Sequence, residues 1–187
     1  MTPEGGRQRD ELRTKVFGER SLYESKWVRL NLVDIEPPDG RRFEHHVVRL
    51  QTCAFAAVLD DDDRVLMLWR YRFATDEWGW ELPGGIVDAE ESAEEAARRE
   101  VEEETGWRVD QLEHLTSFQP MSGMVDTPHV LFAGRNAVQV GEPSDAEEAA
   151  IIDWVPMSTV LELVRKGEVI GSGSLVSLLY LLARRAG

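Results

Sequence analysis

The stretch "LPGGIVDAEESAEEAARREVEEETGW", residues 82–107, constrains the fold most, because its second half carries both end signals of a helix. Ser92 followed by Glu95 is typical of a capping box, in which each residue satisfies a backbone N–H of the other. Gly106 stands where a left-handed residue commonly ends a helix. We therefore predict an amphipathic helix between Ser92 and Gly106, with alanines and Val101 on its apolar side.

Three carboxylates share one face of this predicted helix. Glu100, Glu103 and Glu104 are spaced i, i+3 and i+4, which stacks them along one side. Such carboxylates repel one another and raise one another's pKa values unless a cation lies beside them. Two interpretations follow from the spacing alone. One is a solvated acidic face that pairs with Arg98 and Arg99, and the other is half of a site for Mg²⁺, which prefers oxygen ligands.

The overall charge limits the kinds of partner that we expect. The chain has 187 residues and a formal net charge of −14, which disfavours binding to nucleic acid backbones or to anionic membranes. Binding of an anionic small substrate then requires positive charge within the site, from arginines or a metal ion. The one cysteine, Cys53, excludes an intramolecular disulfide and fits a reducing compartment. With no signal-like N-terminus and no apolar run of membrane-spanning length, we expect a cytoplasmic protein.

The N-terminal quarter differs in pattern from the rest of the chain. Residues 1–15 are polar and charged, which predicts a loose arm. Residues 16–50 alternate between apolar and polar positions on both sides of the turn signal at 37–40, which predicts two or three antiparallel strands. The remaining residues, 51–187, are expected to form the main domain.

The main domain mixes strands and helices. Apolar stretches on both sides of the acidic turn at 60–63 predict a hairpin, and the segment 74–91, rich in glycine and tryptophan, predicts a loop. After the central helix come two strand-like stretches, an acidic loop and a third strand, followed by two amphipathic helices. Because no strand–helix–strand rhythm is visible, we predict an α+β fold.

The spacing of the fixed residues from the glycine-rich loop to the end of the helix resembles the Nudix box, G-x5-E-x7-R-E-U-x-E-E-x-G-U, where U is bulky and apolar. The matching residues are Gly85, Glu91, Arg99, Glu100, Val101, Glu103, Glu104, Gly106 and Trp107. This resemblance implies a Nudix α/β/α sandwich with a mixed sheet, here with an N-terminal antiparallel strand extension. It also implies hydrolysis of a nucleoside diphosphate linked to another moiety, with Mg²⁺ or Mn²⁺ as the cofactor.

The resemblance implies a set of metal ligands. Glu100 and Glu104 match the glutamates that bind the metal ion, and Glu103 matches a third ligand or a partner just outside the metal's own ligands. The carbonyl of Gly84 matches a backbone ligand. Bound cations of this kind stabilise the charge that develops on a diphosphate and can activate the attacking water.

Two further box residues match residues that hold the site together. Arg99 corresponds to the arginine that orients the catalytic glutamate, so that Arg99 and Glu100 are both candidates for catalysis. Glu91 corresponds to a glutamate that holds the loop to the helix. The acidic loop before the third strand matches the region that supplies a mobile catalytic glutamate in the family, for which Glu147 and Glu148 are candidates and Glu148 is preferred.

The resemblance extends over about residues 20–185 and points to the ADP-ribose pyrophosphatase group. Arg72 matches that group's strand arginine, and its guanidinium can bind the substrate diphosphate through two hydrogen bonds. Arg70 is a weaker candidate for the same role, with a surface charge as the alternative. Glu81 matches a glutamate at the edge of the active site and is a candidate to contact metal or water.

Aromatic residues offer surfaces on which the base of a nucleotide can stack. Trp80 and Phe43 are the candidates for substrate binding, together with Trp78, and a place in the core or an interface is the alternative for each. Residues 117–134 resemble the proline-containing strand and loop of ADP-ribose enzymes. They depart from that pattern at Thr127, where the group has an acidic residue, and this departure leaves the nucleotide sugar open.

The resemblance implies a metal-dependent hydrolase that splits ADP-ribose, or a related nucleoside diphosphate sugar, into AMP and a sugar phosphate. The alternatives are another Nudix substrate, such as GDP-mannose, a dinucleoside polyphosphate or a damaged nucleoside triphosphate, and a non-catalytic module that binds a nucleotide sugar. The strands before Leu50 resemble the segment through which ADP-ribose pyrophosphatases form an intertwined dimer. A homodimer with twofold symmetry is therefore expected.

Overall fold

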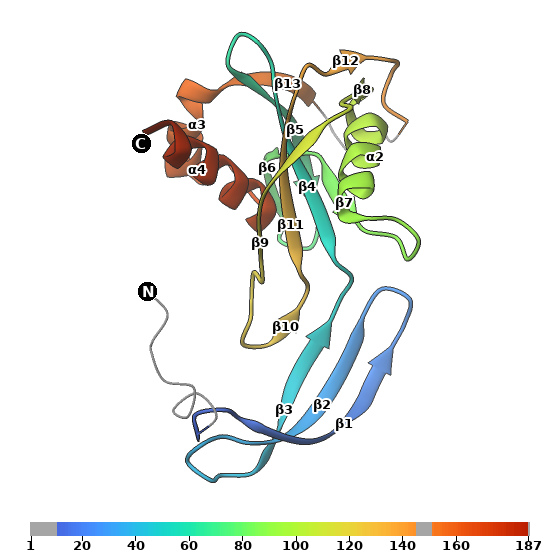
Figure 1. Ribbon diagram of the computed structural model, residues 1–187, viewed down its shortest axis with the longest axis vertical. Coiled ribbons are helices and arrows are strands. Elements are labelled where there is room, and N and C mark those ends of the chain that lie inside the picture. Colours follow the sequence, from blue (N-terminus) through green and yellow to red (C-terminus); the bar gives the residue numbers. More distant parts are fainter. Residues whose placement is uncertain (1–10, 145–150, 187) are drawn as a thin grey trace. The chain divides into compact units, whose positions relative to one another are not determined.

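The computed structural model describes residues 11–144 and 151–186 (Figure 1). The chain divides into two compact units. The first unit contains Met1–Gln51 and Met121–Thr127, and the second contains Thr52–Pro120 and Pro128–Gly187. The segment 121–127 therefore belongs with the N-terminal strands, although the chain reaches it only after the central helix.

The first unit is a sheet with the strand order β1-β2-β3-β10. Its strands are β1 (Lys15–Glu24), β2 (Arg29–Glu36), β3 (Phe43–Arg49) and β10 (Val125–Asp126). The first three strands are antiparallel neighbours, as the alternating pattern around the turn predicts. The short β10 runs parallel to β3, with Val125 beside Val48.

The second unit is built around a mixed sheet with the order β13-β5-β4-β11-β9, in which β11 runs parallel to β4. Its strands are β4 (Cys53–Leu59), β5 (Arg64–Arg72), β6 (Glu77–Glu81), β7 (Gly84–Ile86), β8 (Trp107–Arg108), β9 (Leu112–Phe118), β11 (His129–Arg135), β12 (Val138–Gln139) and β13 (Ile151–Pro156). The helices of this unit are α2 (Ala93–Thr105), α3 (Met157–Lys166) and α4 (Ser172–Ala186). β6 pairs with β5, β7 pairs with β4, and β12 pairs with β8 in a separate ribbon.

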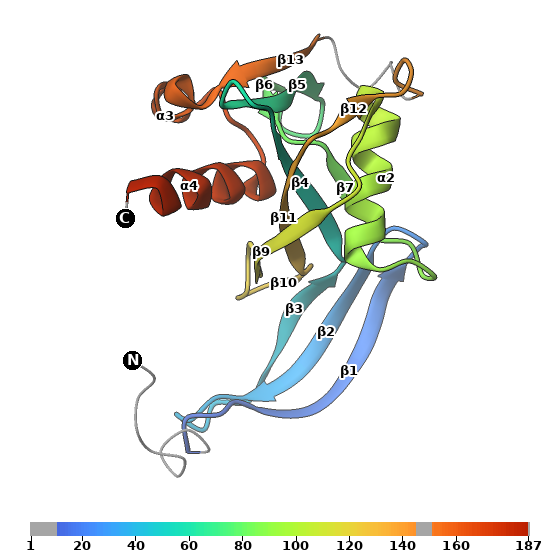
Figure 2. The same ribbon diagram turned by 45° about the horizontal axis from the view of Figure 1, so that its top comes forward.

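Both faces of the central sheet are buried. Successive residues of β4 point alternately to opposite faces, so Ala56 and Val58 join the core under α2, whereas Ala57 and Leu59 join the core under α3 and α4. Figure 2 shows α2 on one side of the sheet and the other two helices on the opposite side. The sheet between helical layers confirms the predicted α+β sandwich, and no helix in the described ranges is long and apolar enough to span a bilayer.

The ends of α2 lie where the sequence predicts them. The N–H of Glu95 donates to the Ser92 hydroxyl, and the Ser92 N–H donates to the Glu95 carboxylate, which completes the capping box. Gly106 ends the helix at φ 73°, a left-handed conformation that favours glycine, and its N–H donates to the carbonyl of Glu102.

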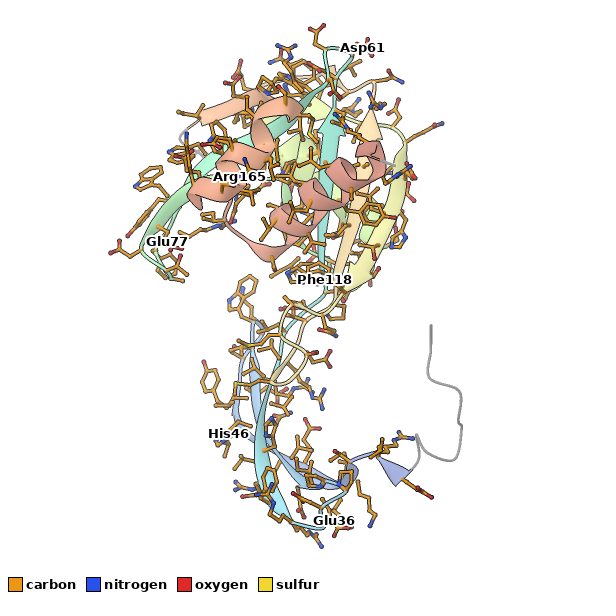
Figure 3. All side chains as sticks on the ribbon, turned by 90° about the vertical axis from the view of Figure 1, so that its left-hand side faces the viewer. Glu36, His46, Asp61, Glu77, Phe118 and Arg165 are labelled. Atoms are coloured by element: carbon orange, nitrogen blue, oxygen red, sulfur yellow. The ribbon has the colours of Figure 1, made fainter. Side chains whose placement is uncertain are left out.

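The prediction of a loop over residues 74–91 is wrong in part, because this segment contains β6 and β7. β6 pairs with β5 along its whole length, and Figure 3 marks Glu77 at the start of this strand. β7 places Gly84 and Gly85 beside β4. The glycines and turn residues of the segment favour a loop locally, whereas pairing with buried strands extends the backbone.

Candidate active site

The glycines of β7 allow α2 to approach the sheet closely. A Cβ on Gly85 would overlap the carboxylate of Glu100, and a Cβ on Gly84 would overlap the backbone of β4. A side chain at position 84 therefore has no room against the strand, and one at position 85 would displace the Glu100 carboxylate. The two glycines bring the glutamate face of α2 directly against the strand backbone.

Arg99 joins the box residues of the loop and the helix. Its guanidinium donates to Glu91 at 2.8 Å, to Glu100 at 2.8 Å and to Glu103 at 2.9 Å. It also donates to the carbonyl of Ile86, at the end of β7. The hydrogen bond to Glu91 contributes most to raising the pKa of Arg99. The same hydrogen bond lowers the pKa of the Glu91 carboxyl group. The arginine thus holds Glu100 and Glu103 in place while Glu91 ties the loop to the helix.

A second arginine holds Glu104 from the sheet. Arg70, on β5, is only 2% exposed and donates from Nη2 to a Glu104 carboxylate oxygen at 2.7 Å. The other carboxylate oxygen of Glu104 accepts the N–H of Gly84 at 2.9 Å. Burial raises the pKa of Glu104 to about 7, although Arg70 and the Gly84 N–H both act to lower it.

The burial of Arg70 excludes the alternative of a surface charge. Its contact with Glu104 was not foreseen from the sequence. The signal was the strand pattern, because Arg70 is in phase with Leu66 and Leu68, which are fully buried. A charged residue at such a position needs a buried partner of opposite charge.

Arg72 and Glu81 continue this line of charges on the β5–β6 hairpin. Arg72 donates from Nη2 to Glu81 at 2.5 Å, and the same carboxylate oxygen lies 3.6 Å from Nε of Arg70. Glu81 is buried, whereas the side chain of Arg72 is 45% exposed. The structure thus brings Arg70, Arg72, Glu81 and Glu104 together as alternating charges, with Arg72 at the accessible end.

The aromatic candidates lie elsewhere. Trp80 pairs with Trp69 across the hairpin, on the face opposite Arg70 and Arg72, and it packs against the core under α3 and α4. The structure therefore does not bring Trp80 together with the charged face. Phe43 belongs to the first unit, where its ring stands edge-on to His45. The two candidate bases, Glu147 and Glu148, lie outside the described residues.

The glutamates do not form a ready-made metal cluster. Within residues 11–144 and 151–186, no three Asp, Glu, His or Cys side chains are grouped as metal ligands. Instead Arg99 and Arg70 pair with the glutamates and partly compensate the repulsion between their carboxylates. The donor set still fits a hard divalent cation, since Glu100 and Glu104 offer only oxygens and the charge of Glu100 helps to raise the pKa of Glu104.

Comparison with known proteins agrees with this geometry. Residues 49–175 match the NUDIX domain, and the chain belongs to the Nudix hydrolase family. Hydrolases of this family act on small nucleotide substrates and generally use divalent metal ions.

Several relatives match most of the chain. A CMP-5'-(N-acetyl-N-hydroxy-3-aminopropyl)phosphonate hydrolase of Streptomyces rubellomurinus is 43% identical over 165 residues, which cover 88% of this chain and 80% of that protein. An ADP-ribose pyrophosphatase of Bacillus subtilis is 25% identical over 177 residues, covering 94% and 96% of the two chains. The crystal structure of an ADP compounds hydrolase has the same fold, with a TM-score of 0.78 at 17% identity, and covers 91% of this chain and 93% of its own.

The buried pair generates a prediction about stability. Arg70→Met leaves Glu104 buried without its cationic partner, which should lower the free energy of unfolding by about 3–5 kcal/mol in metal-free protein. Arg64→Met on the same strand is the control, because Arg64 pairs at the surface and should matter by about 1 kcal/mol or less. Urea titration followed by circular dichroism measures both. If both variants lost the same free energy of unfolding, the Arg70–Glu104 contact would contribute no more to stability than the Arg64 ion pair.

Proposed function

We propose that the protein hydrolyses the diphosphate linkage of a nucleoside diphosphate sugar, with ADP-ribose as the leading substrate and AMP and ribose 5-phosphate as products. One observation carries the proposal. The glutamate face of α2 meets the charged face of the β5–β6 hairpin at β7, so that carboxylates and an accessible arginine converge. A cation held by the carboxylates and the guanidinium of Arg72 then address the same diphosphate.

In this proposal, Glu100, Glu104 and the carbonyl of Gly84 hold the divalent cation, with Glu103 as a further ligand or an outer partner. Once bound, the cation stabilises negative charge on the diphosphate and makes a bound water more acidic. Arg99 fixes Glu100 and Glu103 through the bonds described above, and Arg70 fixes Glu104.

Arg72 has a different role from Arg70 and Arg99, because its side chain is accessible to the substrate. Its guanidinium can exchange part of its contact with Glu81 for phosphate oxygens, while Glu81 stays anchored by the ion pair with Arg70. The oxygen of the attacking water forms a bond to phosphorus as the bridging P–O bond breaks. Glu148, or its neighbour Glu147, takes the proton, and the bridging oxygen leaves with the second phosphate.

Loss of the Glu104 charge should sharply lower turnover, while the amide oxygen of the glutamine can still accept the hydrogen bond from Arg70. Glu104→Gln keeps the shape of the side chain and should lower kcat by about 100-fold or more, as should excess chelator on the wild type. Glu102→Gln is the control, because Glu102 lies on the same helix but pairs with Arg108 at the surface. Steady-state kinetics on ADP-ribose measure the effect. Full activity in chelator, or equal losses in the two variants, would contradict the assignment.

A second substrate class is favoured by the 43% identical relative, whose name specifies a phosphonate linked to CMP. A CMP-linked phosphonate and ADP-ribose share the linkage of a nucleoside 5'-phosphoryl group to a second phosphorus atom. The same metal ligands and the same arginine therefore serve both. GDP-mannose, dinucleoside polyphosphates and damaged nucleoside triphosphates share the linkage as well, whereas a non-catalytic binding module would leave all of them intact.

A substrate panel in water labelled with ¹⁸O separates these possibilities. We expect ADP-ribose to give the highest kcat/KM, with a single ¹⁸O atom in one of its two products by mass spectrometry. A higher kcat/KM for a CMP-linked phosphonate would transfer the assignment to that class. Tight binding of nucleotides with no cleavage of any panel member would instead establish the binding module.

We also propose that the protein is a homodimer joined through the first unit. Every residue of β1 is exposed, and this edge strand carries apolar side chains, namely Val16, Phe17, Leu22 and Tyr23. An exposed edge strand with apolar side chains is a template for pairing with another chain. A twofold axis through this surface would bury the same patch on both subunits.

Light scattering coupled to gel filtration tests the dimer. Wild-type protein should elute with twice the mass of the 21.2 kDa chain, and the double variant Val16→Glu/Leu22→Glu should elute as a monomer because the charges cannot be buried in an interface. Leu161→Glu is the control, since Leu161 is an exposed apolar residue of α3 in the second unit. A monomeric wild type would contradict the proposal.

A further inference from the structure

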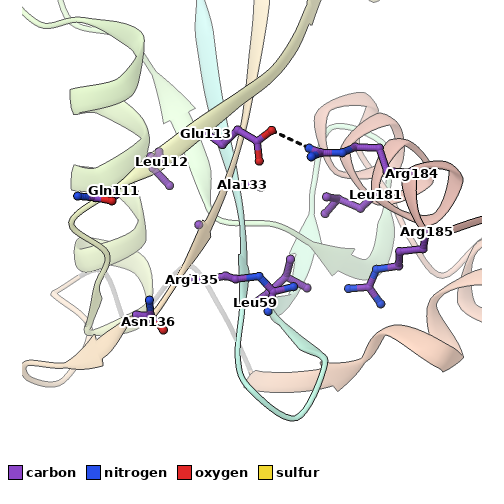
Figure 4. Close-up of a pocket in the computed structure, with 11 residues that line it drawn as sticks. Leu59, Gln111, Leu112, Glu113, Ala133, Arg135, Asn136, Leu181, Arg184 and Arg185 are labelled. Carbon is purple, nitrogen blue, oxygen red and sulfur yellow. Dashed lines mark hydrogen bonds and ion pairs between the residues drawn. The ribbon is translucent and has the colours of Figure 1, made fainter. Parts of the chain in front are cut away.

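The second unit contains a pocket that the proposed chemistry does not use. Its volume is about 550 Å³, and it lies among the ends of β4, β9 and β11 and the last turns of α4 (Figure 4). The side chains that carry the argument are Leu59, Leu112, Leu181, Arg135, Arg184 and Arg185. Three leucines thus provide an apolar floor, and three arginines surround it.

This pocket is separate from the candidate active site. Ala54, near the start of β4, pairs with Gly85 of the candidate active site, whereas Leu59 ends the same strand at the pocket. Five residue steps along a strand span roughly 16 Å. A ligand in the pocket therefore does not touch the glutamates of α2.

The lining of the pocket has more basic than acidic side chains, although the protein as a whole is acidic. Glu113 is the one acidic residue among its lining residues, against three arginines, while the whole chain carries a net charge of −14. Arg184 pairs with Glu113 at 2.8 Å, and Arg185 pairs with Asp63 at 2.5 Å. Both carboxylates are more than half exposed, so solvent screens these pairs and an incoming anion can replace them readily.

Arg135 differs from the other two arginines. Its guanidinium donates to the carbonyl of Asp60 at 3.3 Å, and within residues 11–144 and 151–186 no carboxylate forms an ion pair with it. Arg184 and Arg185 have a structural reason to lie where they do, because cations stabilise the last turn of a helix. Arg135 ends a strand on the other side of the pocket, where its side chain is exposed and is not at a helix end (Figure 4).

We propose that this pocket is a second binding site, which takes a small phosphomonoester of the size of a nucleoside monophosphate. The guanidinium of Arg135 binds the phosphate group, with Arg184 and Arg185 contributing after they release their surface partners. The leucine floor takes the organic part of the ligand. A volume of about 550 Å³ lies within the range of small-molecule sites.

The test uses the full chain without added metal, with AMP as the probe and adenosine, inorganic phosphate and ribose 5-phosphate as comparisons. Methyl resonances of Leu59, Leu112 and Leu181 report on the pocket in an NMR titration. We expect saturable shifts with AMP, weaker binding of inorganic phosphate and ribose 5-phosphate, and none of adenosine. Arg135→Gln should weaken the binding of AMP by about tenfold or more.

Two variants separate this site from its surroundings. Arg165→Gln is the matched control, because Arg165 is an exposed arginine of α3 outside the pocket, and it should bind AMP normally (Figure 3). Arg72→Gln should also leave the leucine shifts unchanged, whether or not the protein hydrolyses ADP-ribose. The proposal is overturned if the leucine methyls do not shift, if Arg135→Gln binds AMP as well as the wild type, or if adenosine or inorganic phosphate binds equally well.

Discussion

The contact between Arg70 and Glu104 is the interaction on which the rest of the site depends. A carboxylate that is only 4% exposed is costly to ionise, and its arginine partner is equally buried, so each is tolerable only because the other is present. This pair fixes α2 against β5 at one point, and Arg99 fixes the helix against the loop at another. Between them, the two arginines partly compensate the charges of Glu100, Glu103 and Glu104 and hold these side chains in place.

The sheet explains why these charges converge. Strand alternation sends Arg70 and Arg72 to the face that α2 covers, and it sends Trp69 and Tyr71 to the opposite face of the same hairpin. Gly85 leaves room for the Glu100 carboxylate of the helix, Gly84 packs closely on β4, and the Gly84 N–H reaches Glu104. A mixed sheet with an apolar core on each face thus carries the charged, partly buried site at the edge of the core under α2. The arginine-lined pocket at the far end of β4 lies apart from this site.

The sequence predicts the features that depend on residues close together in the chain. The ends of α2 follow from the capping residues Ser92 and Gly106, and the fixed spacing of the box identified Arg99 and its glutamates. The sequence does not predict contacts between residues that are far apart in the chain. Arg70 meets Glu104 across 34 residues of chain, and β10 joins β3 through Val125 and Val48, which lie far apart in sequence. The glycines of β6 and β7 are poor strand formers and favour a loop, and only pairing with β5 and β4 extends these segments into strands.

The central claim is that the glutamate face of α2 holds divalent ions against a bound diphosphate. Anomalous diffraction from crystals soaked with Mn²⁺ and a non-hydrolysable methylene analogue of ADP-ribose tests it most directly. We expect anomalous peaks in direct contact with oxygens of Glu100 and Glu104, and a diphosphate analogue that touches both the ions and Arg72. Manganese bound only elsewhere, with Glu100 still paired to Arg99 and Glu104 still paired to Arg70, would contradict it.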